Sequence, residues 1–194
     1  MQGRSGTANS RHAEVIVLIG VSGSGKSTVG KRLAPALGAT FLEGDDYHPS
    51  ANVAKMRAGQ PLNDADRAPW LDKLGQAIGA HSRAGRPLVV ACSALRRSYR
   101  DRLAKAARQP LTFVHLTIPP SVLEARMRAR HLHFMPAALL ESQLKTLEPL
   151  GNEEDGTEIA ETGTSQQTVE AIRRWLRLRR EGKLHGRHEK GRHR

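Results

Sequence analysis

The chain has 194 residues, enough for one domain of ordinary size, and its single cysteine, Cys92, excludes an intramolecular disulfide. No run of roughly eighteen apolar residues predicts a membrane span, and the polar N-terminus lacks the apolar stretch of a signal peptide. The net charge is +12, but residues 173–194 hold ten Lys and Arg against two Glu, which is +8 of that excess. These features predict a soluble, cytoplasmic domain over residues 14–180, with a flexible segment 1–13 and a basic, disordered tail 181–194.

Apolar, strand-forming runs alternate along the chain with stretches of helical spacing. We expect strands at 15–19, 40–42, 88–92, 111–117 and, in a more polar sequence, 157–160. We expect helices at 26–37, 49–57, 65–83, 98–108, 120–130, 136–147 and 168–178. Because each parallel strand needs a crossover, this alternation predicts an α/β fold with a mostly parallel sheet and helices on both faces. Ligands then gather at the carboxyl ends of the strands.

A complete phosphate-binding motif, G-x-x-x-x-G-K-[ST], lies between the first predicted strand and helix. We expect it to bind a nucleotide through residues Gly20, Val21, Ser22, Gly23, Ser24, Gly25, Lys26, Ser27 and the following Thr28. Glycines let successive N–H groups turn inward, Lys26 would reach the β- and γ-phosphates, and the Ser27 hydroxyl would bind Mg²⁺. The alternative is an ordinary Gly/Ser turn with an incidental lysine. The motif indicates a nucleoside triphosphate and leaves the reaction open.

Acidic and polar residues follow the second and third predicted strands, beside the phosphate loop. Phosphoryl transfer needs a group that takes the proton of the acceptor hydroxyl, and we choose Asp45 for this role. Glu43 either faces Mg²⁺ through water or belongs to a solvated acidic turn. His48 either bonds the acceptor or caps the next helix, and Ser93 follows the third strand close to the same edge.

Five sequence blocks resemble the gluconate kinase family. They are FLEGDDYHP at 41–49, GQPLND at 59–64, RAPWL at 67–71, CSALRRSYRD at 92–101 and the stretch 142–149. Together with the phosphate loop they extend the resemblance from about residue 15 to about residue 154. The acceptor-side blocks are specific, because other P-loop kinases share only the phosphate loop.

The resemblance implies transfer of the γ-phosphate of ATP, with Mg²⁺, to the 6-hydroxyl of D-gluconate. It also implies a three-layer P-loop kinase fold with a five-stranded sheet, a helical lid at about 124–148 and a homodimer. Gluconate is an anionic polyol, so its carboxylate calls for arginine. Arg57, Arg67 and Arg100 are the candidates. Each taken alone is better explained as an ordinary exposed arginine, and the surrounding motif blocks are what favour a binding role. His48 and Ser93 are candidates for the hydroxyls.

Basic residues crowd the predicted lid. Arg126 and Arg130 share one helical face, and the resemblance implies that Arg126 binds the nucleotide while Arg130 acts at the developing charge of the phosphoryl group. A solvated basic face is the alternative.

Two features depart from the family pattern. Arg96 stands where the family usually has lysine, and the last predicted strand, with the polar stretch 157–161, is where an apolar strand ending near an aspartate is expected. The third strand also ends in Cys92-Ser93 without the acidic residue that often holds Mg²⁺. Two other functions compete with the gluconate kinase interpretation. One is a different P-loop kinase, such as a shikimate-like enzyme, for which we find no acceptor signature. The other is a nucleic-acid-binding P-loop ATPase, which the basic tail alone suggests and the acceptor blocks argue against.

Overall fold

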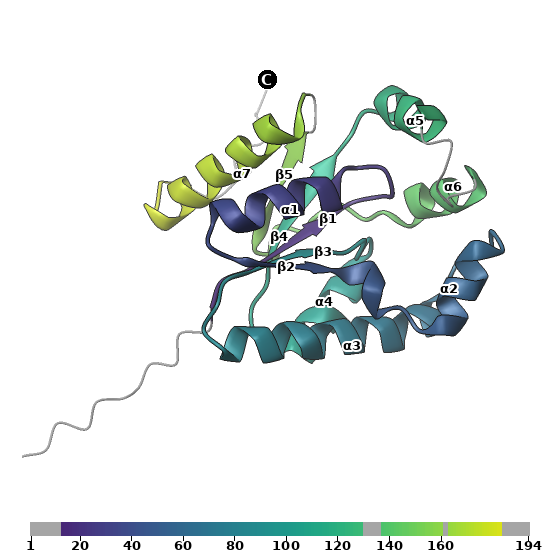
Figure 1. The fold of residues 1–194 in the computed structure, drawn as a ribbon, viewed down its shortest axis with the longest axis horizontal. Coiled ribbons are helices and arrows are strands. Elements are labelled where there is room, and N and C mark those ends of the chain that lie inside the picture. The colour runs from purple at the N-terminus through teal and green to yellow at the C-terminus, as the bar shows by residue number, and fades with distance from the viewer. Residues whose placement is uncertain (1–12, 130–136, 161–162, 184–194) are drawn as a thin grey trace, which may run out of the picture.

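The computed structural model describes residues 13–129, 137–160 and 163–183. Five parallel strands form one sheet in the order β2-β3-β1-β4-β5 (Figure 1). The strands are β1 (Val15–Ile19), β2 (Thr40–Glu43), β3 (Leu88–Ala91), β4 (Thr112–Thr117) and β5 (Gly156–Ala160). The predicted parallel α/β sheet is confirmed, including the polar last strand. The predictions for the two chain ends fall almost entirely on residues outside the described ranges.

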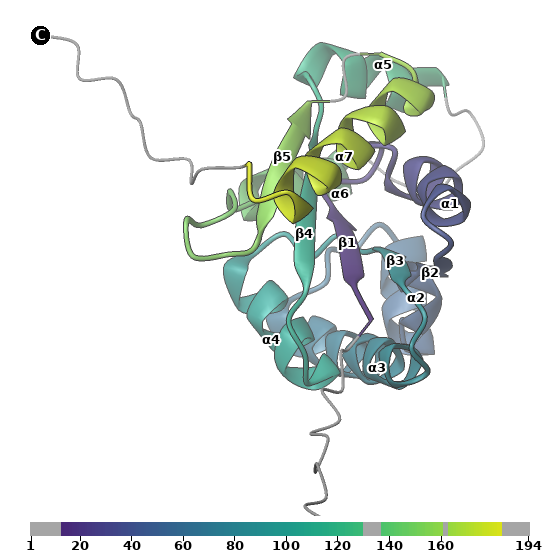
Figure 2. The same ribbon diagram turned by 90° about the vertical axis from the view of Figure 1, so that its left-hand side faces the viewer.

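Seven α-helices and one 3₁₀ helix are present in the described ranges. They are α1 (Lys26–Ala36), η1 (Gly44–Tyr47), α2 (Ser50–Arg57), α3 (Asp64–Arg83), α4 (Arg97–Ala107), α5 (Pro120–Ala129), α6 (Ala137–Thr146) and α7 (Ser165–Arg180). Helices α3 and α4 cover one face of the sheet, and α1 and α7 cover the other (Figures 1 and 2). Helices α2, α5 and α6 lie beyond the carboxyl ends of the strands (Figure 1). None of the described helices is both long and apolar enough to cross a membrane.

The central strand β1 is buried on both sides, as its continuous apolar sequence predicts. Val15, Val17 and Ile19 join the apolar cluster under α3 and α4. Ile16 and Leu18 point the other way, into the cluster under α1 and α7. Both faces of β1 are therefore covered by apolar side chains, as expected of a strand at the centre of a parallel sheet.

Two of the described helices begin at a capping box that the sequence encodes. Asn63 and Asp66 form a capping box that starts α3, and Thr164 and Gln167 form another that starts α7. Within the described ranges, η1 is the element that the sequence analysis does not predict, since Asp45 and Asp46 lie in a 3₁₀ helix directly after β2.

Helices α3 and α4 pack unusually closely because two glycines of α3 face α4. A Cβ atom at Gly75 would lie 2.5 Å from the Cβ of Ala106 and 2.8 Å from the carbonyl oxygen of Leu103. Gly79 lies just as close to the backbone of Ala107. These positions demand glycine for close approach and not for backbone freedom.

Gly75→Ala is expected to destabilise the domain. Alanine favours a helix over glycine by about 1 kcal/mol, but a crowded contact of this kind costs about 1–3 kcal/mol. Urea denaturation should therefore show a net loss of stability. The exposed neighbour Gln76, changed to Ala, is the control and should stay within about 0.5 kcal/mol of the wild type. A Gly75→Ala protein as stable as the wild type would contradict the packing described here.

Candidate active site

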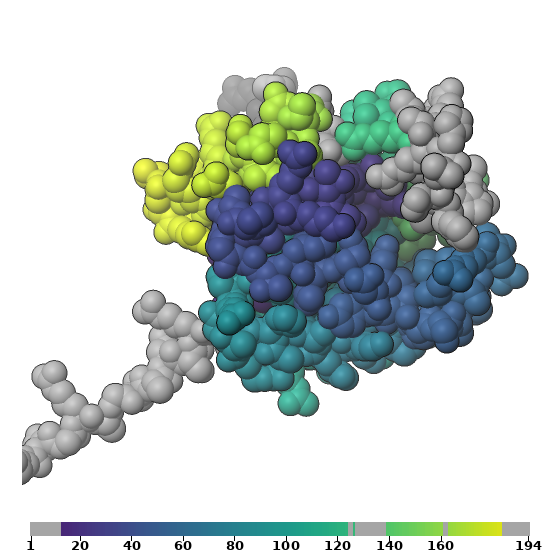
Figure 3. All heavy atoms as spheres, viewed as in Figure 1, coloured from purple at the N-terminus to yellow at the C-terminus, as the bar shows by residue number. Residues whose placement is uncertain are grey.

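The phosphate loop, residues 20–27, leaves β1 and enters α1 at one edge of the sheet. Gly23 and Gly25 adopt φ of 84° and 87°, and Gly20 adopts 142°, so the loop needs glycine at all three places. In the space-filling view, the surface of α1 and the phosphate loop lies between α7 on one side and α2 and α3 on the other (Figure 3).

The same loop has the features of an anion site. Helix α1 starts without a side-chain cap, so its first N–H groups are left for a ligand, and the helix dipole adds positive charge. The Ser24 hydroxyl is buried and has no hydrogen-bond partner among the described residues. A buried polar group of this kind calls for a partner, and a phosphate oxygen would provide one. The residues present therefore fit a nucleoside triphosphate.

Two cationic side chains meet the phosphate loop. The Lys26 ammonium donates to the carbonyls of Gly20 at 2.8 Å and Val21 at 2.9 Å. Arg126, on α5, donates to the Gly23 carbonyl at 3.4 Å, so α5 brings a guanidinium to the loop. Arg130, the other predicted lid arginine, lies outside the described residues.

Ser27 and Glu43 meet between α1 and β2. Burial raises the pKa of the Glu43 carboxyl above its usual value, and a hydrogen bond with the Ser27 hydroxyl opposes this. Within the described ranges, no three His, Cys, Asp or Glu side chains come together as a metal site. A magnesium ion at Ser27 would therefore depend on the nucleotide phosphates for most of its ligands.

A pocket opens beside the phosphate loop, at the carboxyl ends of β2 and β3. The loop, the segment after β2, helix α3 and helix α6 all contribute to its wall. Its lining residues are Ser22, Lys26, Asp45, His48, Met56, Pro61, Leu62, Arg67, Trp70, Ser93, Leu139, Ser142 and Gln143. Four of the predicted acceptor residues, Asp45, His48, Arg67 and Ser93, thus reach one pocket together with Lys26.

His48 and Asp45 stand side by side in this pocket in very different environments. The Asp45 carboxylate is 74% exposed, whereas the His48 side chain is only 4% exposed. The His48 ring stacks on Trp70 with centroids 4.1 Å apart, and its Nε2 lies 3.9 Å from Asp45 Oδ1. Burial lowers the pKa of His48 to about 4, against the opposing effect of Asp45. His48 is therefore neutral at pH 7.

Arg67 is held at the pocket wall by its neighbours. It donates to the Leu62 carbonyl, and its guanidinium lies over the Tyr99 ring, 5.4 Å from the centroid. Arg96 also lies over Tyr99, at 5.7 Å, and pairs with Asp64 at 3.0 Å. The planar guanidinium of Arg96 suits this stacked position better than the lysine that the family usually has.

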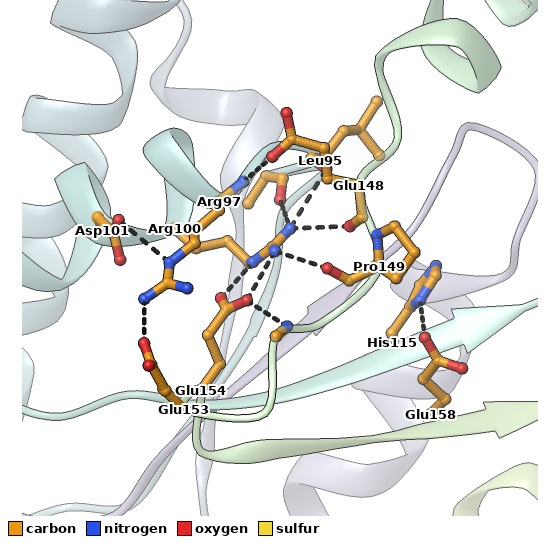
Figure 4. A network of polar contacts seen from close by, with 12 residues as sticks. Leu95, Arg97, Arg100, Asp101, His115, Glu148, Pro149, Glu153, Glu154 and Glu158 are labelled. Atoms are coloured by element: carbon orange, nitrogen blue, oxygen red, sulfur yellow. Dashed lines mark hydrogen bonds and ion pairs between the residues drawn. The ribbon is translucent and has the colours of Figure 1, made fainter. Parts of the chain in front are cut away.

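The other two candidate arginines are not brought to the pocket. Arg57 is exposed at the end of α2 and is absent from the pocket lining. The side chain of Arg100 is fully buried and forms two bonds to Glu154, at 2.5 and 2.8 Å (Figure 4). The prediction that Arg100 binds the acceptor carboxylate is therefore corrected, because the protein itself already uses this guanidinium.

Arg100 joins distant parts of the chain around the end of α6. Beyond Glu154, it donates to the carbonyls of Leu95 and Glu148, each at 3.2 Å, and of Pro149 at 3.1 Å (Figure 4). The segment after α6 is thereby tied to the start of α4. Burial alone would raise the pKa of Glu154, but the hydrogen bond from Arg100 brings it below its usual value.

Helix α6 supplies a pocket residue for which the sequence analysis predicts no role. Gln143 Oε1 accepts a hydrogen bond from the backbone N–H of Ser22, at 2.6 Å. Gln143 lies in one of the blocks that resemble the gluconate kinase family, which was the available signal, but its contact joins positions 121 residues apart. Cys92, at the end of β3, is buried, and burial raises the pKa of its thiol to about 12, as suits a structural residue.

Comparison with known proteins adds independent information. Residues 15–150 match the family model described as an AAA domain. The chain is 39% identical to the thermoresistant gluconokinase of Escherichia coli over 87% of this chain and 98% of that protein. It is 50% identical to a gluconokinase of Gluconobacter oxydans over 72% of this chain and 78% of that one. The crystal structure of a gluconokinase from Sinorhizobium meliloti superposes with a TM-score of 0.73 at 42% identity, covering 90% of this chain and 99% of that one.

Replacing Arg100 should lower the free energy of unfolding. Arg100→Met leaves the Glu154 carboxylate buried without its partner, and breaking a buried pair in this way costs about 3–5 kcal/mol. Urea denaturation of Arg100→Met, Glu154→Gln and the double variant should show that the second change costs much less once the first is made. Arg102→Met is the matched control, because Arg102 forms a partly exposed pair with Asp72, and its loss should cost about 1 kcal/mol at most. A stable Arg100→Met protein that binds gluconate poorly would restore the original prediction.

Proposed function

The chain belongs to the gluconokinase family of P-loop kinases, and we propose that it transfers the γ-phosphate of ATP to the 6-hydroxyl of D-gluconate. The observation that carries this proposal is that Lys26 of the phosphate loop, Asp45 and Arg67 line the same pocket. A phosphate donor and an anionic, hydroxylated acceptor would be held there side by side, as phosphoryl transfer requires.

On the nucleotide side, residues 20–28 would bind the phosphates of ATP. The backbone N–H groups at the start of α1, the Ser24 hydroxyl and the Lys26 ammonium would contact phosphate oxygens. Arg126 would add a second cation from α5, and Arg130 stays a prediction for the same role. When bound, Mg²⁺ would neutralise charge on the phosphates, and Ser27 would hold it with Glu43 nearby.

On the acceptor side, each polar residue of the pocket has a proposed role. Asp45 would take the proton of the 6-hydroxyl. As it does so, the hydroxyl oxygen would form a bond to the γ-phosphorus, and the bond from the γ-phosphorus to the ADP oxygen would break. Arg67 would pair with the gluconate carboxylate, since a guanidinium matches a carboxylate with two parallel hydrogen bonds. His48 and Ser93 would bond the sugar hydroxyls, and Trp70 would support the His48 ring from the core.

The competing functions have less support. A shikimate-like kinase would share the phosphate loop but does not account for the acceptor blocks. A nucleic-acid-binding ATPase does not account for the polar pocket beside Lys26. We further expect a cytoplasmic homodimer that needs no nucleic acid, as the resemblance to the family implies.

Asp45→Asn and Lys26→Ala should each lower kcat strongly while the fold stays intact. Loss of a general base typically costs about 10²–10⁴-fold in rate, and loss of the phosphate-loop cation should cost about 10²-fold or more. The measurement is ADP release in a coupled assay with Mg²⁺-ATP against gluconate, other sugar acids, shikimate and nucleoside monophosphates.

Asp46→Asn is the control for that assay, because Asp46 is an exposed neighbour of Asp45 that does not line the pocket. It should turn over gluconate at close to the wild-type rate. Wild-type turnover in Asp45→Asn would remove Asp45 from its role. Turnover of another acceptor with none on gluconate would contradict the proposed substrate.

A further inference from the structure

His48 is fixed in the pocket by contacts on three sides. Its ring lies nearly parallel to Trp70, at an interplanar angle of 17°. Its Nδ1 lies 3.3 Å from the Asn52 side-chain nitrogen, Nδ2, and its Nε2 is the ring nitrogen that points toward Asp45. A side chain held this firmly presents one defined nitrogen to the acceptor.

The orientation of Asn52 decides which ring nitrogen carries the proton. Asn52 is 3% exposed, and its Nδ2 donates to the backbone carbonyl of Asp66 at 2.8 Å. A carbonyl oxygen can only accept, so the amide nitrogen and not the amide oxygen must face it. The same nitrogen faces His48 Nδ1, and an amide nitrogen offers only donors. His48 Nδ1 must therefore accept, which leaves the proton of a neutral ring on Nε2.

We propose that Asn52 is a positioning residue that fixes His48 as the Nε2–H tautomer, so that His48 donates a hydrogen bond to the acceptor beside Asp45. The role at the acceptor rests on the proposed function, whereas the tautomer follows from the contacts of Asn52 alone. The gap of 3.9 Å between His48 Nε2 and Asp45 Oδ1 is too long for a direct hydrogen bond. A hydroxyl of the acceptor lying against both groups would accept from His48 and donate to Asp45.

This arrangement divides the chemistry between the two side chains. With Nδ1 engaged by Asn52 and Nε2 already protonated, the neutral ring of His48 has no lone pair to offer the acceptor. Arg67 nearby also disfavours a positive charge on the ring, and the low pKa of His48 agrees with this. Asp45 is then left as the proton acceptor, and His48 orients the hydroxyl whose proton Asp45 takes.

The tautomer can be observed directly in the intact protein. In long-range ¹H–¹⁵N correlation spectra of the ¹⁵N-histidine-labelled protein, the His48 signals are those missing from His48→Gln. We expect a protonated Nε2 and an unprotonated Nδ1 at neutral pH, without any substrate present. A proton on Nδ1, or a charged ring at pH 7, would overturn the proposal whatever the enzyme phosphorylates.

Kinetics with gluconate then tests the role of the tautomer. Asn52→Leu has a similar size but no amide, and should lower kcat about 10-fold or more with little change in the KM for ATP. Lys55→Met is the matched control, because it breaks the 2.6 Å ion pair to Asp66 at the same junction of α2 and α3 without touching His48. It should keep the wild-type kcat even where it lowers thermal stability.

A second pair of variants covers the case in which Asn52→Leu does not fold. His48→Gln keeps a donor near the position of Nε2, and His48→Phe keeps a ring stacked on Trp70. The donor role predicts that His48→Gln retains clearly more activity than His48→Phe. Equal activity in the two, or a wild-type kcat in Asn52→Leu, would overturn the proposal.

The tests of the tautomer do not depend on the identity of the acceptor. If the wild type turns over an acceptor other than gluconate, the proposed substrate is wrong, but the same comparisons made with that acceptor still decide the roles of Asn52 and His48.

Discussion

The parallel sheet brings together the phosphate loop and the strand-end residues of the pocket. Because β2, β3 and β1 are neighbours and run in the same direction, their carboxyl ends meet at one edge. The phosphate loop follows β1, Glu43 ends β2 with Asp45 just beyond it, and Ser93 follows β3. Segments widely separated in the sequence thereby present a cation, carboxylates and a hydroxyl to one small volume. The burial of β1 between two helical layers, which places this strand at the centre of the sheet, thus also positions the chemistry.

A buried ion pair supports the side of the pocket that the sheet does not supply. Arg100 and Glu154 hold the segment after α6 against the start of α4, and α6 in turn carries Gln143 to the backbone of Ser22. Buried pairs are weak evidence for stability as such, but one that joins distant segments specifies their arrangement. We interpret the Arg100 network as the anchor of α6 at the pocket.

The sequence predicts well what is encoded locally. The phosphate loop is a continuous motif, and its glycines and lysine lie where the spacing places them. The arginines show the limit, because Arg57, Arg67 and Arg100 carry the same local signal and lie at an exposed helix end, at the pocket wall and inside the protein. Only tertiary packing separates them. The bond between Gln143 and Ser22 and the orientation of Asn52 likewise depend on contacts between segments that no local pattern joins.

The most direct test of this account is the preference for an acid over a neutral polyol. The wild type should have a much higher kcat/KM for gluconate than for glucitol, which has the same number of carbons and no carboxylate. Arg67→Met should lose most of that preference, because its kcat/KM for gluconate should fall about 10- to 100-fold. A loss of this size is typical when a hydrogen bond to a charged group is removed. The KM for ATP should be unchanged, and Arg57→Met should behave as the wild type. Retention of the preference in Arg67→Met, or its loss in Arg57→Met, would contradict the assignment of the pocket.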